Sequence, residues 1–198
     1  MKRKFHDVQQ TSPEWFELRK GRFTASTFKD LFAKPATQTY RDVIYQVAFE
    51  RITNTTPENF VTEWMKRGSE LEPIARELYE LQTYNYVRNG GFFELGEWIG
   101  ASPDGLIGED GIIEIKCPKY TTFIDYVLNG SLPTAYKWQV HGQLYVADRQ
   151  WCDFVAYHPN MPLFVHRVYR DEKMIKELTD QIELAINDAM SIIKQLKR

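Results

Sequence analysis

The spacing of hydrophobic residues changes along the chain, and in its first part the spacing is typical of helices. Ser12-Pro13 predicts a helix start, because serine caps a helix end and proline fits the first turn. Further helices are expected over residues 24–32, 40–51 and 63–83. Pro73 lies inside the last of these, so that helix either begins near Gly68 or bends at the proline.

The middle of the chain changes to short apolar runs bounded by glycine and proline, which are typical of strands. The clearest strand is Ile112–Lys116, with Gly108–Gly111 as the turn before it and Pro118 as its end. Strands are also expected over residues 92–99, 153–157 and 163–169, and helices over residues 120–129, 134–146 and 171–196. This order predicts an α/β domain with a mixed sheet in the middle of the chain.

Composition narrows the class of protein without identifying it. The chain has 198 residues, 43% of them hydrophobic and 26% charged, as expected for one globular domain. The net charge of −2 argues against non-specific coating of DNA but leaves a nuclease open, since metal-binding carboxylates offset a basic surface. The two cysteines cannot supply a four-cysteine metal site. We see neither a signal peptide nor a run of about 18 apolar residues, and expect an intracellular protein without a membrane span.

The residues that carry chemistry are Asp104, Glu114 and Lys116. Glu114 and Lys116 are two apart in the predicted strand, so their side chains point to the same face. The Gly108–Gly111 turn folds Asp104 back towards Glu114. Two carboxylates with the Ile115 carbonyl suit a hard cation such as Mg²⁺, and a lysine beside them can orient or deprotonate a water or stabilise negative charge. The spacing alone is equally compatible with an exposed Glu114–Lys116 salt bridge.

These residues carry a resemblance to a known nuclease family. Pro103-Asp104 followed by Glu114-Ile115-Lys116 resembles the PD-(D/E)XK nuclease motif, and the chain as a whole resembles the bacteriophage lambda exonuclease family of viral recombination nucleases. The resemblance covers nearly the whole chain in the same order, and its other blocks are Trp15 with Leu18-Arg19 and Gly21, Thr24-Ala25-Ser26, Gly68 with Glu72, Ala135-Tyr136 with Gln139-Val140, and Arg170-Asp171-Glu172-Lys173. It implies a restriction-endonuclease-like α/β core, with a central mixed β-sheet flanked by helices, in a single domain over residues 1–198.

The resemblance also implies roles for individual residues. Asp104, Glu114 and the Ile115 carbonyl would hold Mg²⁺ or Mn²⁺, and Lys116 would act on the attacking water, with Glu72 and Gln139 completing the catalytic set. Three residues align with a pocket for a 5′-terminal phosphate, namely Arg19, Ser26 and Ser102. Met65 aligns with an apolar wedge that separates the strands, and Tyr136 with a supporting position; a place in the core is an equal alternative for both.

The activity implied is that of a 5′→3′ exonuclease. Family members digest one strand of linear double-stranded DNA from a 5′-phosphorylated end and leave a 3′ overhang, which a single-strand annealing protein uses in recombination. They form ring-shaped trimers around the DNA. By resemblance we therefore expect a DNA exonuclease that forms a homotrimer and acts in the cytoplasm of a bacterial host cell.

Two other functions share the same residues. A structure-specific or site-specific endonuclease could use the same core, because fold and core do not fix the substrate. Such an enzyme would need no pocket for a terminal phosphate, and Arg19 with Ser26 therefore argues against it. A non-catalytic DNA-binding scaffold would be expected to lack a carboxylate or the lysine, and here none is missing.

Overall fold

The computed structural model describes residues 1–57 and 63–197, except for the side chains of residues 63–65. The centre of the fold is a five-stranded mixed sheet. Its strand order is β3 (Val87–Asn89), β6 (Gly105–Ile107), β7 (Gly111–Lys116), β8 (Trp151–Ala156) and β9 (Phe164–Tyr169). β7 and β8 are parallel, and the other neighbours are antiparallel. The predicted mixed sheet is therefore confirmed. The parallel pair arises because the helical connection between β7 and β8 returns the chain to the end of the sheet from which β7 starts.

A second, four-stranded sheet was not predicted. Its order is β1 (Arg3–His6), β4 (Phe92–Leu95), β5 (Ile99–Ala101) and β2 (Phe23–Thr24). The run over residues 92–99, expected as one strand, turns back at Gly96, whose φ of 64° suits a residue without a side chain. β1 and β2 are too short for an alternating pattern to show in the sequence.

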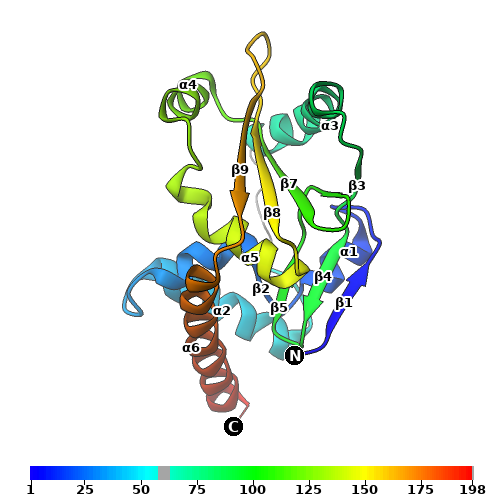
Figure 1. Ribbon diagram of the computed structural model, residues 1–198. Coiled ribbons are helices and arrows are strands. Elements are labelled where there is room, and N and C mark those ends of the chain that lie inside the picture. The colour runs from blue at the N-terminus through cyan, green and yellow to red at the C-terminus, as the bar shows by residue number, and fades with distance from the viewer. Residues whose placement is uncertain (58–62, 198) are drawn as a thin grey trace.

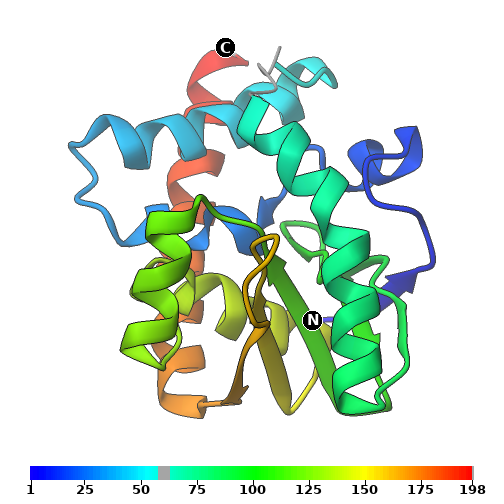
Figure 2. The same cartoon turned by 90° about the horizontal axis from the view of Figure 1, so that it is seen from above.

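Helices cover both faces of the five-stranded sheet. α3 (Glu63–Thr83) covers one face, where its Ala75 and Tyr79 pack with Ile113 of β7. α5 (Lys137–Ala147) covers the other face and packs with Ile112 of β7. Behind α5 lie the 3-10 helix η1 (Ala25–Phe32), α2 (Gln38–Thr53) and α6 (Glu172–Leu196), as Figure 1 shows. α3 and α4 (Tyr120–Asn129) flank the sheet from opposite sides (Figure 2).

The helix boundaries agree with the sequence in most places. α1 (Pro13–Arg19) begins after the predicted serine cap, where the Ser12 side chain accepts from the Trp15 amide, and α4 ends at Asn129 with Gly130 as its C-cap. One expectation was inaccurate, because the segment after Thr24 forms the 3-10 helix η1 rather than an α-helix. Of the two alternatives for α3, a start near Gly68 is excluded, since the helix begins at Glu63, five residues earlier, and has Pro73 inside it.

The C-terminal part forms as the apolar spacing predicts. The apolar residues that recur at helical spacing along α6 are largely buried and include Leu178, Ile182 and Ala185. The short 3-10 helix η2 (Thr134–Tyr136) leads directly into α5. In the part of the chain that the structure describes, no helix is both long and apolar enough to cross a membrane.

Candidate active site

The side chains of β7 point alternately to the two faces of the sheet, as the sequence predicts. Ile113 and Ile115 point into the apolar cluster under α3. Glu114 and Lys116 point to the opposite face, which α5 covers, and only 1% of Glu114 is exposed. A carboxylate this deeply buried is costly unless charged or hydrogen-bonding groups surround it. The neighbours of Glu114 therefore have to supply those groups.

Three donors meet the Glu114 carboxylate. Gln139 Nε2 lies 2.5 Å from Oε1, and Gln143 Nε2 lies 2.6 Å from Oε2. The Lys116 ammonium forms an ion pair with Oε1 and lies 5.3 Å from the centre of the Tyr136 ring. Gln143 was not predicted as part of the site. Its signal was available, because a residue four positions after Gln139 lies on the same helical face.

Asp104 immediately precedes β6, whose first residue Gly105 pairs with Ile113, so β7 continues past Asp104 towards Lys116. Its amide donates to the Ile113 carbonyl at 3.1 Å, and its Oδ2 accepts from the Ile115 amide at 2.6 Å. The N–H and C=O of one strand residue point to the same side of the strand. The Ile115 carbonyl therefore faces the same side as its amide, along the edge of β7 that extends beyond its pairing with β6. Asp104, Glu114 and this carbonyl thus gather at the end of β7.

The helix α3 brings a third carboxylate, Glu72, to this group. Burial raises the pKa of Glu72, and the charge of Glu114 adds to the shift. Burial also holds the pKa of Asp104 well above its usual value, and the charges of Glu114 and Glu72 raise it further. Arg76, one turn after Glu72, donates to the Asp104 carbonyl oxygen. Arg76 is a further residue that the sequence analysis did not single out.

The donors at this site fit a hard divalent cation. The mutual repulsion of the carboxylates is the kind of electrostatic strain that a bound cation relieves. Among the described residues, no group of three or more His, Cys, Asp or Glu side chains is arranged to hold a metal ion. Asp104 and Glu114 with the Ile115 carbonyl are a partial oxygen shell. Such a shell suits Mg²⁺, which usually keeps several waters.

The charge of Lys116 is secured by its surroundings. Burial alone would lower the pKa of Lys116, but the charges of Glu114 and Asp104 outweigh burial and hold the pKa above its usual value. Lys116 is therefore an ammonium that faces the carboxylates from the side of Tyr136. Tyr136 itself contacts Phe154 and Tyr126, which makes it part of the wall of the site.

A second cluster, here called the arginine cluster, contains Trp15, Arg19, Thr24, Ser26 and Ser102. The Arg19 guanidinium lies over the Trp15 ring at 4.2 Å and donates to Thr24 and Ser26 at 3.3 and 3.4 Å. Trp15 Nε1 donates to the Ser102 hydroxyl at 2.8 Å. The structure thus connects all three residues that the resemblance assigns to a phosphate pocket. Thr24 and Trp15 are additional members with no role predicted for them.

One short segment joins the two clusters. Ser102 belongs to the arginine cluster, and Asp104, two residues later, belongs to the carboxylates. Gln10 Nε2 donates to the Pro103 carbonyl at 3.1 Å and reaches Asp104 Oδ1 at 3.4 Å. A β-carbon on Gly90 would meet the Pro103 carbonyl oxygen at 1.7 Å, so only glycine fits behind this segment. The two clusters are therefore held at a fixed separation.

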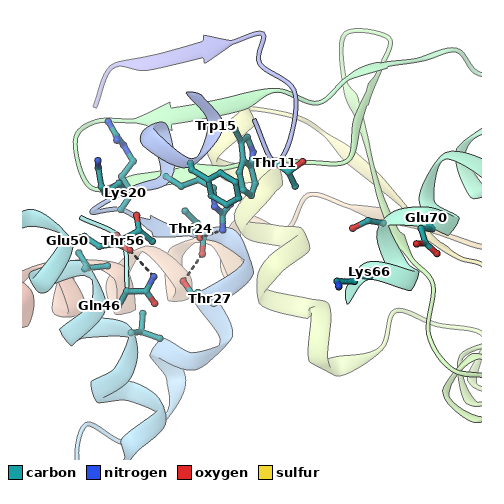
Figure 3. Close-up of a pocket in the computed structure, with 16 residues that line it drawn as sticks. Thr11, Trp15, Lys20, Thr24, Thr27, Gln46, Glu50, Thr56, Lys66 and Glu70 are labelled. Carbon is teal, nitrogen blue, oxygen red and sulfur yellow. Dashed lines mark hydrogen bonds between the residues drawn. The ribbon is translucent and has the colours of Figure 1, made fainter. Parts of the chain in front are cut away.

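A cavity of about 600 Å³ opens beside the arginine cluster. Figure 3 shows Trp15 and Thr24 on one wall and Lys66 and Glu70 of α3 across from them. Arg19, Lys20, Arg22 and Lys66 give the lining mainly positive charge. A cavity with this lining suits an anionic ligand. The side chain of Met65, the predicted wedge, lies outside the described residues.

Comparisons with known proteins identify the family of this chain. The model of the YqaJ-like viral recombinase domain matches residues 14–150, which is more than half of the chain. A comparison with curated protein sequences gave no significant match.

Solved structures extend the likeness to almost the full length. An alkaline exonuclease from Laribacter hongkongensis is 34% identical, with a TM-score of 0.87 over 94% of this chain and 97% of that one. A structure of the same enzyme in complex with dAMP covers the same shares at 34% identity, with a TM-score of 0.88. A phage-related exonuclease from Haemophilus somnus, 16% identical over 88% of this chain and 96% of that one, shares the fold at a TM-score of 0.68. The chain therefore belongs to the YqaJ-like viral recombinase family and is a nuclease of the exonuclease class.

Proposed function

We propose that this exonuclease digests one strand of linear double-stranded DNA in the 5′→3′ direction, starting at a 5′-phosphorylated end and leaving a 3′ overhang. The observation that carries the proposal is the spacing of Ser102 and Asp104. A terminal phosphate held by the arginine cluster would lie beside the carboxylates, so the first phosphodiester of that strand would meet the site of cleavage. Guanidinium groups and hydroxyls are suited to bind such a phosphate.

In this proposal Asp104, Glu114 and the Ile115 carbonyl hold Mg²⁺ or Mn²⁺. The bound ion would supply charge neutralisation at the scissile phosphate and lower the pKa of a water. Gln139 and Gln143 hold the Glu114 carboxylate in place through one donor for each oxygen. Lys116 orients the attacking water or stabilises the negative charge that develops on the phosphate. Glu72 faces the same site from α3 and is the third acidic group.

The family resemblance extends the proposal to assembly and partners. We propose a homotrimeric ring around the DNA, which would keep the enzyme on its substrate between successive cleavages. We also propose that the 3′ overhang passes to a single-strand annealing protein. Light scattering of the purified protein tests the trimer, and a mass near that of one chain would contradict it.

The decisive experiment compares substrates that differ only at their ends. Linear duplexes with a 5′-phosphate or a 5′-hydroxyl on the same labelled strand are incubated with the protein and Mg²⁺, alongside a covalently closed circle. We expect rapid digestion of the phosphorylated strand, slower digestion of the hydroxyl strand and no cleavage of the circle. Cleavage of the circle as fast as the linear duplex would instead identify an endonuclease. DNA binding without cleavage would identify a non-catalytic scaffold.

A further inference from the structure

Glu50 is a buried carboxylate in the wall of the arginine cluster's cavity. Only 5% of it is exposed, and it lines the same cavity as Trp15, Arg19 and Thr24 (Figure 3 labels Glu50, Trp15 and Thr24). A negative charge beside a site for an anion weakens the binding of that anion. The presence of Glu50 here therefore calls for a role other than ligand binding. Glu50 takes no direct part in the proposed cleavage.

The hydrogen bonds of Glu50 show what it holds. Oε2 accepts from the backbone amide of Gly21 at 2.6 Å, and Oε1 accepts from Gln46 Nε2 at 3.0 Å. The next residue, Arg51, donates from Nε to the Gly21 carbonyl at 2.7 Å. Two consecutive residues of α2 therefore bind both polar backbone groups of one glycine. A backbone held at its donor and its acceptor has little freedom to shift.

Gly21 lies in the turn that connects α1 to β2. Its φ of 69° lies in the left-handed region, and a β-carbon there would meet Arg51 Cγ at 2.8 Å. The Arg51 guanidinium is itself fixed, because it lies 3.5 Å from the centre of the Trp98 ring. The turn is therefore clamped between a buried carboxylate and an immobilised arginine.

The clamped turn carries the arginine cluster on both sides. Arg19 lies two residues before Gly21, and Thr24, its hydrogen-bond partner, lies three residues after it. Glu50 also acts on Arg19 through its charge. Burial lowers the pKa of Arg19 to about 10, and the negative charge of Glu50 opposes that shift. Glu50 thus supports both the place and the charge of the guanidinium without occupying its hydrogen-bonding face.

We propose that Glu50 and Arg51 are positioning residues for the 5′-phosphate pocket: by clamping Gly21 they aim the Arg19 guanidinium at the terminal phosphate of the DNA. This inference rests on the proposed function, because it assumes that the arginine cluster binds that phosphate. In this proposal neither residue binds the phosphate itself, because each of them hydrogen-bonds the backbone of Gly21. Both act through Arg19, so their loss reduces the advantage of a 5′-phosphate over a 5′-hydroxyl and leaves cleavage itself in place.

The experiment measures kcat and KM on the two linear duplexes for the wild type, Glu50→Ala, Glu50→Gln and Arg51→Ala. Arg19→Ala and the double variant Arg19→Ala/Glu50→Ala complete a cycle that separates positioning from other effects. The control is Asp153→Asn, because Asp153 is equally buried, 2% exposed, but pairs with Arg167 away from the cavity. Thermal unfolding of every variant is recorded alongside.

We expect Glu50→Ala and Arg51→Ala to reduce the phosphate-to-hydroxyl ratio of kcat/KM on the order of tenfold or more, mainly through KM on the phosphorylated end. Glu50→Gln should retain most of the ratio, since an amide oxygen can still accept from Gly21. Glu50→Ala should have no further effect on the ratio when Arg19 is already alanine. Asp153→Asn should lower the melting temperature and keep the ratio.

The outcomes separate the two claims. A wild type with equal rates on both ends overturns the proposed function, and the inference with it. A wild type that prefers the phosphate, with a Glu50→Ala variant that keeps this preference, overturns the inference alone. Equal losses on both ends that follow the melting temperature also overturn it, because they show a structural role only.

Discussion

The carboxylate site and the arginine cluster lie next to each other but are assembled in different ways. Asp104, Glu114 and Lys116 come from one hairpin, and the pleat of β7 fixes which side chains converge. The arginine cluster joins α1, β2, η1 and the end of β5, and its Trp15–Ser102 hydrogen bond spans 87 residues. A site built on one hairpin depends on local geometry, whereas a site built from separate elements depends on how they pack. Variants should therefore separate cleavage from end recognition.

The largest effect is expected from Lys116→Ala. Removing the ammonium removes charge stabilisation at the site of cleavage, so kcat should fall roughly 10²–10³-fold on both kinds of end. Lys176→Ala, an exposed lysine on α6 that pairs with Asp180, is the matched control and should cleave normally. Single-turnover digestion of both duplexes measures the effect. A variant that loses activity on phosphorylated ends only would contradict the assignment of Lys116 to cleavage.

The next largest effect is expected from Arg19→Ala, and it should be confined to one substrate. Loss of a guanidinium that binds phosphate should lower kcat/KM on 5′-phosphorylated ends roughly tenfold to a hundredfold and leave 5′-hydroxyl ends nearly unchanged. Arg19→Lys should restore only part of the loss, because lysine lacks the planar fork. Arg88→Ala, at a surface ion pair with Glu109, serves as the control. Equal losses on both ends would remove the distinction between the two clusters.

A smaller effect is expected from Gln143→Leu, which removes one of the two amide donors to Glu114. The unpaired carboxylate oxygen should cost about 1–3 kcal/mol of stability and shift the Mg²⁺ dependence of cleavage roughly tenfold towards higher concentration. Calorimetry of metal binding gives a readout independent of activity. The comparison variant is Gln139→Leu, which removes the other donor. Unchanged metal affinity in both variants would show that the amides do not position Glu114.

The smallest effect is a change of end preference with pH. A terminal phosphate gains its second negative charge near pH 6, so the preference should increase from about pH 5.5 to pH 7. Because the pKa of Arg19 is lowered only to about 10, the guanidinium stays charged and the preference should remain level up to about pH 9. It should decline as the pH approaches 10. A profile of kcat/KM on both ends measures this, and a decline centred near pH 8 would contradict the role of Arg19.

Elements with a local sequence pattern could be predicted, whereas elements that depend on contacts between distant segments could not. Apolar residues recur at strand spacing beside the Gly108–Gly111 turn and at helical spacing along α6, so these elements could be predicted directly. The four-stranded sheet could not, because β1 and β2 pair with distant strands and are too short to show a period. The sequence left the start of α3 open, because Pro73 is compatible with a later start near Gly68 as well as with the helix from Glu63 that forms.

The candidate site shows the same limit in its neighbours. Gln143 could have been found from its four-residue spacing to Gln139. Gln10 could not, because it reaches Asp104 from a turn 94 residues away and no local pattern marks it. The identities of Arg19, Ser26 and Ser102 came from family resemblance, and the sequence alone gave no reason to expect them in one cluster.

The glycine behind Pro103 has a consequence for redesign of this enzyme. Because Gly90 leaves no room for a side chain, any substitution there would displace Ser102 and Asp104 together. End selectivity and turnover would then change as one quantity, and a screen that starts from this position could not improve either separately. Mutations that alter selectivity alone are expected in α1, β2, η1 and α2, which carry the arginine cluster and its clamp and lie outside the catalytic hairpin.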